Sequence, residues 1–237
     1  MKGRPTLMPT KFFHQDGGKR TPLSKPEEVK PFLAKGHHWK TGYSAAELAK
    51  SWIRAQDFPP PVRRVIETCA DYRGLRLIEG YFERKTDLRT PGRHSQTDLL
   101  VIGETSAGPV VIGVEGKRDE AFGPIVSDWL AKGGRRQERL EGLCRVLGLD
   151  PGQCHALRYQ LFHRTVAVLF EAEAAGAKNA MLLVHSFSMG DSGFNDFERF
   201  TAELGVPLTV RNSVSEAKAL NDMVFRFAWV SDPKPPK

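Results

Sequence analysis

With 237 residues and 40% hydrophobic content, the chain is long enough for one sizeable core, and a single α/β domain with extensions is the simplest interpretation. Three irregularly placed cysteines do not fit a disulfide framework or a paired zinc site, and they favour a reducing cytoplasm. The sequence begins without the apolar segment of a signal peptide and has no apolar run of membrane-spanning length, so we expect a cytoplasmic protein without a membrane span.

The positive charge is concentrated at the N-terminus. Residues 1–40 hold nine Lys/Arg and three Asp/Glu, so this segment carries +6 of the formal net charge of +7. Its Pro, Gly and Lys content, with few aliphatic residues, predicts a loosely ordered arm suited to a polyanion. A solubilising tail is the alternative, and composition does not separate the two. We expect one α/β domain at 41–230 and a flexible tail at 231–237.

Two helices are expected before the first strand. Ser44 and Glu47 have the spacing of a capping box, and apolar residues at helical spacing follow, which predicts a helix over 45–55. The second helix starts with prolines in its first turn and ends before Gly74. Its apolar stripe consists of Val62, Val65, Ile66 and Cys69.

Strands and helices then alternate. Residues 75–85, "LRLIEGYFERK", predict a strand, and 97–117, "TDLLVIGETSAGPVVIGVEGK", predict a hairpin that turns at Ser106–Gly108. The rest of the chain predicts helices at 124–132, 135–148 and 155–176, a strand at 180–188, a helix at 194–205 and a strand at 223–232.

The hairpin ends in charged residues that would lie close together. In an extended strand Glu115 and Lys117 share one face. If residue 104 pairs with 109, Asp98 falls opposite Glu115, where Cβ atoms are about 4.5 to 5.5 Å apart and like charges repel. A hard divalent cation such as Mg²⁺ would relieve that repulsion. Lys117 would then lie beside the metal-bound water and a scissile phosphate.

These residues resemble the motif of the PD-(D/E)XK nuclease superfamily. Thr97-Asp98 and Glu115-Gly116-Lys117 match its acid and its (D/E)-x-K triplet, although Thr97 replaces the proline, which contributes no ligand. The resemblance covers about residues 60–190. It implies an α/β fold with a PD-(D/E)XK nuclease-like core of α-β-β-β-α-β order, a mixed sheet flanked by helices and an N-terminal helical extension. Three segments, "HWKTGYSAAELAKSW", "VEGKRDEAFGP" and "LRYQLFHRT", are also similar to a bacterial domain family of unknown function.

The resemblance implies roles for individual residues. Asp98 and Glu115 would bind Mg²⁺, or Mn²⁺ in its place, with the carbonyl of Gly116 as a third ligand. Lys117 would orient the attacking water and stabilise the phosphate. Members of the superfamily often add an acid from the preceding helix, a role for which Glu67 and Glu83 compete. Each of these two is alternatively a solvated surface acid.

The same motif has plainer interpretations. A Glu-x-Lys triplet is weak by itself, and Glu83-Arg84-Lys85 is a second one. Asp98, Glu115 and Lys117 could form a cross-strand charge cluster on a solvated edge, or belong to a nuclease fold used only for binding. We expect a Mg²⁺-dependent phosphodiesterase acting on nucleic acid, with DNA favoured. The alternative is a catalytically inactive nucleic-acid-binding or interaction protein, and a homodimer is left open.

Two further groups are candidates for nucleic-acid contact. Gln160, His163 and Arg164 lie on one stripe of a helix that is otherwise largely apolar, where they could face the cleft or form hydrogen bonds within the core. Arg135 and Arg136 belong to a basic cluster at a helix start, a position that attracts anions. The alternative for this cluster is a solvated run of charge.

Overall fold

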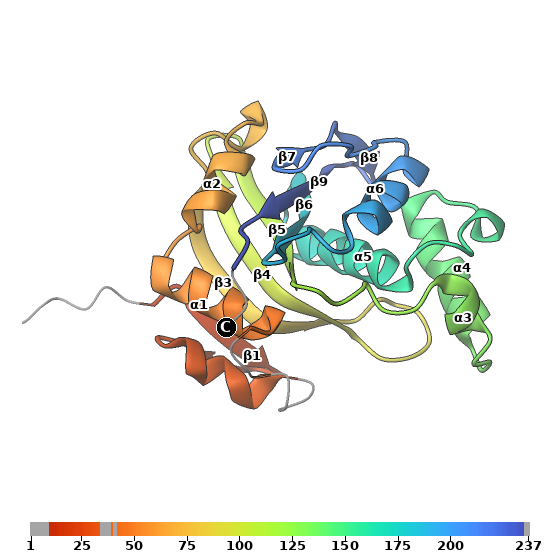
Figure 1. The fold of residues 1–237 in the computed structure, drawn as a ribbon, viewed down its shortest axis with the longest axis horizontal. Coiled ribbons are helices and arrows are strands. Elements are labelled where there is room, and N and C mark those ends of the chain that lie inside the picture. The colour runs from red at the N-terminus through yellow and green to blue at the C-terminus, as the bar shows by residue number, and fades with distance from the viewer. Residues whose placement is uncertain (1–9, 34–38, 40–41, 235–237) are drawn as a thin grey trace, which may run out of the picture.

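The computed structural model describes residues 10–33, 39 and 42–234, in which nine strands form one mixed sheet (Figure 1). Its strand order is β2-β1-β3-β4-β5-β6-β9-β7, and β8 pairs with β9. The strands are β1 (Phe12–Asp16), β2 (Lys19–Pro22), β3 (Arg76–Thr86), β4 (Ser95–Thr105), β5 (Gly108–Lys117), β6 (Asn179–Ser186), β7 (Ser213–Val214), β8 (Lys218–Leu220) and β9 (Met223–Ser231). The α/β class and the helix-flanked mixed sheet are confirmed.

Helices and 3₁₀ turns connect these strands. The α-helices are α1 (Ser44–Ala55), α2 (Pro60–Ile66), α3 (Val126–Leu130), α4 (Arg136–Leu147), α5 (Tyr159–Ala174) and α6 (Phe194–Glu203). The 3₁₀ segments are η1 (Pro26–Phe32), η3 (Ala70–Tyr72) and η4 (Pro151–Gln153). Every helix and strand expected after residue 41 has a counterpart at its predicted place. The strands β1, β2, β7 and β8 were not predicted.

The centre of the sheet is buried on both faces. Helices α1 and α2 cover one face, and α4, α5 and α6 cover the other (Figure 1). On β5, Val110, Ile112 and Val114 pack on the α1 side and Val111 packs on the α5 side. A strand buried on both faces has a nearly continuous apolar sequence. This explains why the run at 110–114 lacks polar alternation.

A glycine allows α5 to lie close against β5. A Cβ atom added at Gly113 would lie 2.2 Å from Cγ2 of Val168, a distance at which the two atoms would overlap. Gly113 shares its strand face with Glu115 and Lys117 because alternate residues point the same way. The contact therefore holds polar residues of α5 near the two charged residues at the end of β5.

The two leading helices differ from expectation at their ends. Helix α1 starts at Ser44 with Tyr43 as its N-cap, and no side chain caps it. Glu47 instead accepts a hydrogen bond from the Gly42 N–H at 3.0 Å and pairs with Lys50 at 3.1 Å. The predicted capping box is therefore wrong, because the N-cap is Tyr43 and not Ser44 and no side chain caps the helix. Helix α2 ends at Ile66, and η3 replaces the rest of the expected helix.

The N-terminal segment is more ordered than expected. Strand β1 pairs with β3, and Phe12, Leu23 and Val29 are buried. The expectation of a loosely ordered arm is therefore wrong for residues 10–33, because three apolar side chains anchor them to the sheet. Residues 1–9, 34–38 and 40 of this expected arm lie outside the described part of the chain.

The C-terminal segment is also attached to the sheet. Backbone hydrogen bonds join Asp232 to Ser186 at 2.8 Å and Lys234 to Phe187 at 3.1 Å. The expected flexible tail thus does not include 231–234, while 235–237 lie outside the described residues. No helix in the described ranges combines the length and apolar content that crossing a membrane requires.

Candidate active site at the end of the β4–β5 hairpin

The predicted register of the hairpin is confirmed. Glu104 pairs with Pro109, and the ladder continues to Leu99 opposite Val114. Asp98 and Glu115 are the next positions beyond that last pair. At this point the Gly116 N–H donates to Oδ2 of Asp98 at 2.9 Å, so a side chain closes the end of the ladder.

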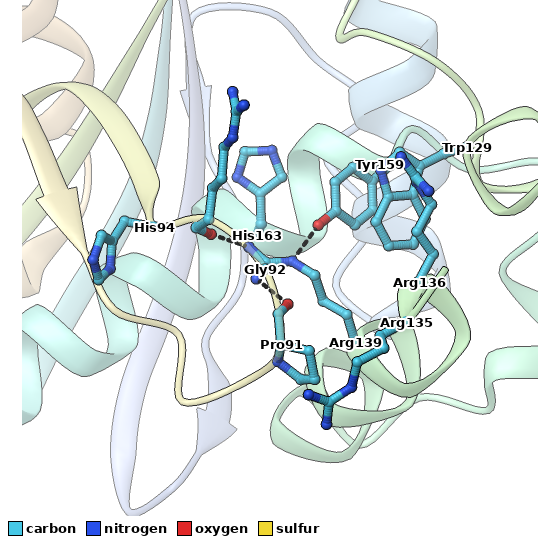
Figure 2. Close-up of a pocket in the computed structure, with 10 residues that line it drawn as sticks. Pro91, Gly92, His94, Trp129, Arg135, Arg136, Arg139, Tyr159 and His163 are labelled. Carbon is cyan, nitrogen blue, oxygen red and sulfur yellow. Dashed lines mark hydrogen bonds between the residues drawn. The ribbon is translucent and has the colours of Figure 1, made fainter. Parts of the chain in front are cut away.

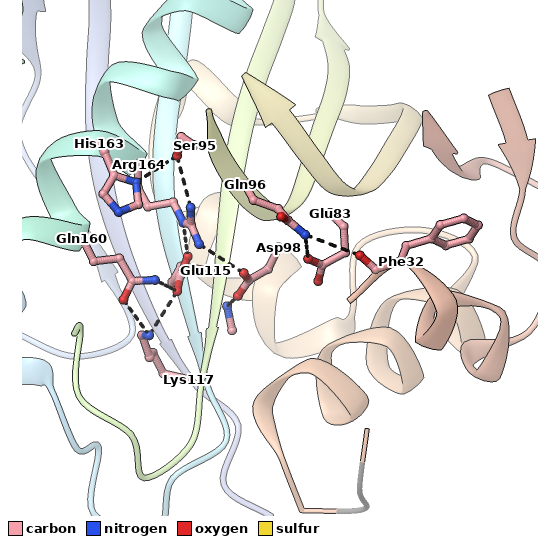
Figure 3. A network of polar contacts seen from close by, with 11 residues as sticks. Phe32, Glu83, Ser95, Gln96, Asp98, Glu115, Lys117, Gln160, His163 and Arg164 are labelled. Atoms are coloured by element: carbon pink, nitrogen blue, oxygen red, sulfur yellow. Dashed lines mark hydrogen bonds and ion pairs between the residues drawn. The ribbon is translucent and has the colours of Figure 1, made fainter. Parts of the chain in front are cut away.

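A cavity of about 300 Å³ opens where the hairpin ends. Most of its charged and amide side chains come from β3, β4, β5 and α5, and Figure 3 shows these pointing toward one another. They are Glu83, Gln96, Asp98, Glu115, Lys117, Gln160 and Arg164, and Glu120 lines the cavity from the loop after β5. We call this the acidic cavity. The three motif residues that the sequence singled out therefore share one cavity.

Arg164 of α5 lies between the two motif carboxylates. Its Nε donates to Oε2 of Glu115 at 2.6 Å, and its Nη2 is 3.5 Å from Oδ1 of Asp98. The side chain of Arg164 is 9% exposed and that of Glu115 is 3% exposed, so this ion pair is buried. The positive group expected between the carboxylates is thus, in the structure, a guanidinium.

Glu115 has further partners on its other oxygen. Gln160 Nε2 donates to Oε1 at 2.5 Å, and Lys117 Nζ is 3.1 Å from the same atom. Lys117 also donates to Oε1 of Gln160 at 3.1 Å, and its Nζ lies 4.7 Å from the ring centre of Phe122. Lys117 is on the same side of the sheet as Glu115, as predicted, and these contacts hold it there.

The carboxyl groups differ in their charge environment. Burial raises the pKa of Asp98 to about 7, helped by the negative charge of Glu115 and opposed by Arg164. Burial also raises the pKa of Glu83 to about 8, with Asp98 as the next cause. For Glu115 burial acts in the same direction, but Arg164 and Lys117 outweigh it and hold its pKa below the usual value. Asp98 and Glu83 therefore lack enough neighbouring positive charge to offset the effect of burial, whereas Glu115 has it.

This imbalance bears on whether a cation fits. The acidic cavity is lined by four carboxyl groups, from Glu83, Asp98, Glu115 and Glu120, against the two cations Lys117 and Arg164. The Asp98 side chain is 21% exposed, and its contact with Arg164 is long, at 3.5 Å between Oδ1 and Nη2. Carboxylate and carbonyl oxygens with water are the ligands that Mg²⁺ prefers. The donor types and the excess of negative charge fit a hard divalent cation beside Asp98.

One observation runs against a preformed metal centre. Within the described ranges, no group of three or more His, Cys, Asp or Glu side chains is placed so that it could hold a metal ion. Both oxygens of Glu115 already accept hydrogen bonds. A cation would thus have to compete with Arg164 for the two motif carboxylates.

The structure separates the two candidates for a third acid. Glu83 lines the acidic cavity, where Gln96 donates to its Oε2 at 2.6 Å. Glu67 is at the C-cap of α2, 42% exposed, and pairs with Arg63 at 3.1 Å. It does not line the acidic cavity. Placing Glu67 at the site was wrong, because α2 ends before it and turns its side chain toward Arg63.

The candidate nucleic-acid contacts fall into two places. Gln160 and Arg164 face the acidic cavity, whereas His163 bonds to Ser95 at 2.9 Å and lines a second cavity. Arg135 and Arg136 line that second cavity as well. The single stripe expected on α5 is therefore divided between two cavities.

Some site residues were not predicted. Ser95 accepts a hydrogen bond from Nη1 of Arg164 at 3.1 Å, and Gln96 holds Glu83. Both belong to the stretch "TPGRHSQ", which by composition is a loop. Their position three and two residues before Asp98, close to the start of the strand that carries it, was the only available signal.

Comparisons with known proteins place the chain in a family. A search of curated proteins and a search of solved structures each found no match. The model of a family described as a domain of unknown function, DUF6946, matches residues 22–234. That match covers most of the sequence, including both strands of the hairpin, the acidic cavity and α5. The chain therefore belongs to the DUF6946 family.

Proposed function

We propose that the protein is a Mg²⁺-dependent phosphodiesterase that hydrolyses nucleic acid, with DNA as the expected substrate, on a PD-(D/E)XK nuclease-like core. One observation carries the proposal. Asp98, Glu115 and Lys117 come from the two strands of one hairpin and enter the same cavity, at the point where the strand pairing ends. A cross-strand cluster on a solvated edge does not account for this, because Glu115 and Lys117 are only 3% and 4% exposed.

Each residue has a role in this proposal. Asp98 and Glu115 would hold the ion, and Glu83 is the acid best placed to add negative charge. The Gly116 carbonyl is a further candidate ligand, because N–H and C=O of one residue in a strand point toward the same neighbour and its N–H meets Asp98. When bound, Mg²⁺ would lower the pKa of a water and neutralise charge on the phosphate.

The basic residues would act on the substrate and on the ligands. Lys117 places a fixed ammonium 3.1 Å from Glu115, where it can stabilise charge that develops on a phosphate. Gln160 and Arg164 orient the Glu115 carboxylate by a hydrogen bond to each of its oxygens. A carboxylate held in this way presents its remaining lone pairs in a fixed direction.

The test is cleavage of a labelled single- or double-stranded DNA with Mg²⁺, Mn²⁺ or EDTA. We expect cleavage that requires a divalent ion and is lost in Asp98→Asn and Glu115→Gln. Lys117→Met should lose cleavage and keep metal binding. Arg63→Ala, which removes the partner of Glu67 away from the cavity, is the matched control and should cleave like the wild type.

A second function is favoured by a specific observation. Arg164 occupies the space between Asp98 and Glu115, and an ion pair of this kind can be the final state of a site that has lost its metal. The chain would then be a nucleic-acid-binding protein without catalysis. Binding of DNA that is unchanged by EDTA and by Asp98→Asn, with no cleavage by the wild type, would select this function.

A further inference from the structure

A second cavity lies beside the acidic one and has the opposite charge. Its volume is about 550 Å³, within the range of pockets that bind small molecules. Its lining includes four arginines, Arg93, Arg135, Arg136 and Arg139, and no Asp or Glu. Figure 2 shows Arg135, Arg136 and Arg139 near Tyr159, Trp129 and His163. We call this the basic cavity.

Arg139 is buried without a counter-charge. It is 7% exposed, and its donors meet neutral groups: Tyr159 Oη at 2.6 Å and the carbonyls of Pro91 and Arg93 at 2.7 and 2.8 Å. Among the described residues, no carboxylate forms an ion pair with it. A buried charge is costly unless it is paired. An anion in the basic cavity would supply the missing charge.

Arg139 positions other cations that can reach a ligand. Its bonds hold the backbone at Pro91 and Arg93, and most of its N–H groups are used in doing so. The Arg93 side chain is exposed and has no hydrogen-bond or ion-pair partner among the described residues. Arg136 bonds only to backbone carbonyls of the preceding turn, including that of Lys132 at 3.0 Å. Arg93 and Arg136 are therefore the groups available to an anion.

His163 adds a neutral donor. Burial, followed by the charges of Arg164 and Arg139, lowers its pKa well below the usual value, so the imidazole is neutral. Ser95 Oγ accepts from Arg164 and lies 2.9 Å from Nδ1 of His163, an arrangement in which the Ser95 O–H can donate to that nitrogen. In that tautomer the ring proton is on Nε2, from which a neutral imidazole can donate one hydrogen bond to a ligand.

The cavity also has an aromatic wall. The rings of Trp129 and Tyr159 stack with centres 3.7 Å apart and an interplanar angle of 12°, and the Arg136 guanidinium lies 5.7 Å from the Trp129 ring centre. Aromatic rings and arginines together are the combination on which nucleic-acid bases stack and phosphates bind. A sugar phosphate without a base would leave the aromatic wall unused.

The two cavities are joined by a short chain of contacts. Arg164 bonds both to Glu115 in the acidic cavity and to Ser95, and Ser95 bonds to His163 in the basic cavity. Helix α5 contributes Gln160 and Arg164 to one cavity and Tyr159 and His163 to the other. A nucleic-acid strand with its scissile phosphate at Asp98 could place a neighbouring nucleotide in the basic cavity.

We propose that the basic cavity binds one nucleotide, with its phosphate at Arg93 and Arg136 and its base against Trp129. The proposal rests on the proposed function in taking this nucleotide from a nucleic-acid strand. A free mononucleotide has the same chemistry and is the other source. Arg139 is a positioning residue here, because it acts through the segment 90–93.

The test is calorimetric titration in EDTA at low salt with four probes: 5′-phosphorylated thymidine dinucleotide, the same dinucleotide without its 5′-phosphate, thymidine 5′-monophosphate and inorganic phosphate. We expect the phosphorylated dinucleotide to bind at least tenfold more tightly than the unphosphorylated one and than inorganic phosphate. Arg93→Ala and Arg136→Gln should each weaken it about tenfold. Arg145→Ala, an exposed arginine on the same helix α4, is the matched control and should bind like the wild type.

The probes also identify the source and separate this proposal from the proposed function. Equal affinity for the monophosphate and the dinucleotide would indicate a free nucleotide, and preference for the dinucleotide would indicate a strand. Binding that Arg93→Ala and Arg136→Gln leave unchanged, or inorganic phosphate binding as tightly as the nucleotides, would overturn the proposal. Absence of DNA cleavage by a wild type that binds the dinucleotide in the basic cavity would remove only the proposed function.

Discussion

The acidic and basic cavities use the same helix in opposite ways. In the acidic cavity, α5 supplies Arg164 to an excess of carboxyl groups, and of these Glu115 is the one that is closely paired. In the basic cavity, Arg139 meets only neutral groups, and the lining has four arginines and no acid, although one of them, Arg135, pairs with Glu138 outside the lining. Buried charge that is paired within the protein mainly orients groups, whereas buried charge left without a partner indicates a ligand of opposite sign. In the proposed function, the acidic cavity orients groups for chemistry and the basic cavity binds a substrate anion.

The largest effect should follow from removing the residue that joins the cavities. Arg164→Met leaves Asp98 and Glu115 buried together without the guanidinium, and breaking a buried pair by removing one partner typically costs about 3 to 5 kcal/mol. Urea denaturation at pH 8 measures this loss of unfolding free energy. Arg89→Ala, which removes an exposed pair with Glu173, is the control and should cost less than about 1 kcal/mol. An equal loss in both variants would contradict the account.

The spacing between β5 and α5 should matter next. Gly113→Ala places a Cβ atom 2.2 Å from Val168, and overpacking of a core typically costs about 1 to 3 kcal/mol. The shift of α5 should also weaken dinucleotide binding in the basic cavity and metal binding in the acidic one. Gly18→Ala, whose added Cβ meets no atom within 4 Å, is the matched control. If Gly113→Ala were as stable as that control, the close contact would not hold α5.

Substitutions in the two cavities should also differ in how they change the pH dependence of stability. The pKa of Asp98 is raised to about 7 and that of Glu83 to about 8, so the folded protein keeps protons that the unfolded chain releases near pH 4. The free energy of unfolding therefore falls as pH rises from about 4 to 8. Each of these two carboxyl groups lowers it by at most about 1.4 kcal/mol per pH unit.

Asp98→Asn should remove part of that slope. Its unfolding free energy relative to the wild type should increase between pH 5.5 and pH 8.5, as measured by urea titration at the two values. Arg93→Ala in the basic cavity should show the same slope as the wild type, since its own charge does not change in this range. A slope unaffected by Asp98→Asn would show that this carboxyl group titrates normally.

The smallest effect concerns the cations of the N-terminal segment. Deleting residues 1–40 would not test them cleanly, because Phe12, Leu23 and Val29 are buried. Lys19, Lys25 and Lys30 are exposed, so their substitution by Gln should preserve the fold. Duplex binding with Ca²⁺ in place of Mg²⁺ should then depend less steeply on salt, by about 0.9 in log–log slope for each phosphate that the variant no longer neutralises.

Substitutions in the basic cavity give a salt-dependence slope with which the effect of the lysine substitutions can be compared. Arg93→Ala combined with Arg136→Gln should lower the slope by about 0.9, the value for the one phosphate that both arginines contact, and the three lysine substitutions should lower it by no more. A larger effect from the lysines would make the N-terminal segment, rather than the basic cavity, the main polyanion-binding surface.

Much of the site could be predicted from sequence because it depends on local periodicity. Side chains along β5 point alternately to the two faces of the sheet, and a two-residue turn follows Thr105. Together these features determine that Asp98 approaches Glu115, and both are visible in one stretch of sequence. The i, i+4 spacing of Gln160 and Arg164 likewise predicts a shared helix face. The direction of that face, toward Glu115, depends on tertiary packing and could not be predicted.

The parts that were missed depend on contacts between distant segments. Strand β1 is short, and its pairing with β3 joins residues nearly 70 positions apart. The basic cavity combines the loop at 91–94 with α3, α4 and α5, and no spacing in the sequence shows that Arg93 and Arg136 line the same cavity. Arg139 lies within a run of charge whose composition suggests a solvated surface. Its burial follows only from the fold.

The most direct test of the central claim is calorimetric titration of Mg²⁺, with Mn²⁺ as a second ion, into the wild type and Asp98→Asn at pH 8. The account predicts that one ion binds to the wild type, that binding weakens as pH falls below about 7 and the Asp98 carboxyl group takes up a proton, and that Asp98→Asn binds at least tenfold more weakly. Arg93→Ala should bind the ion like the wild type. Equal metal binding by the wild type and Asp98→Asn, or no binding by either at millimolar concentrations, would contradict the account.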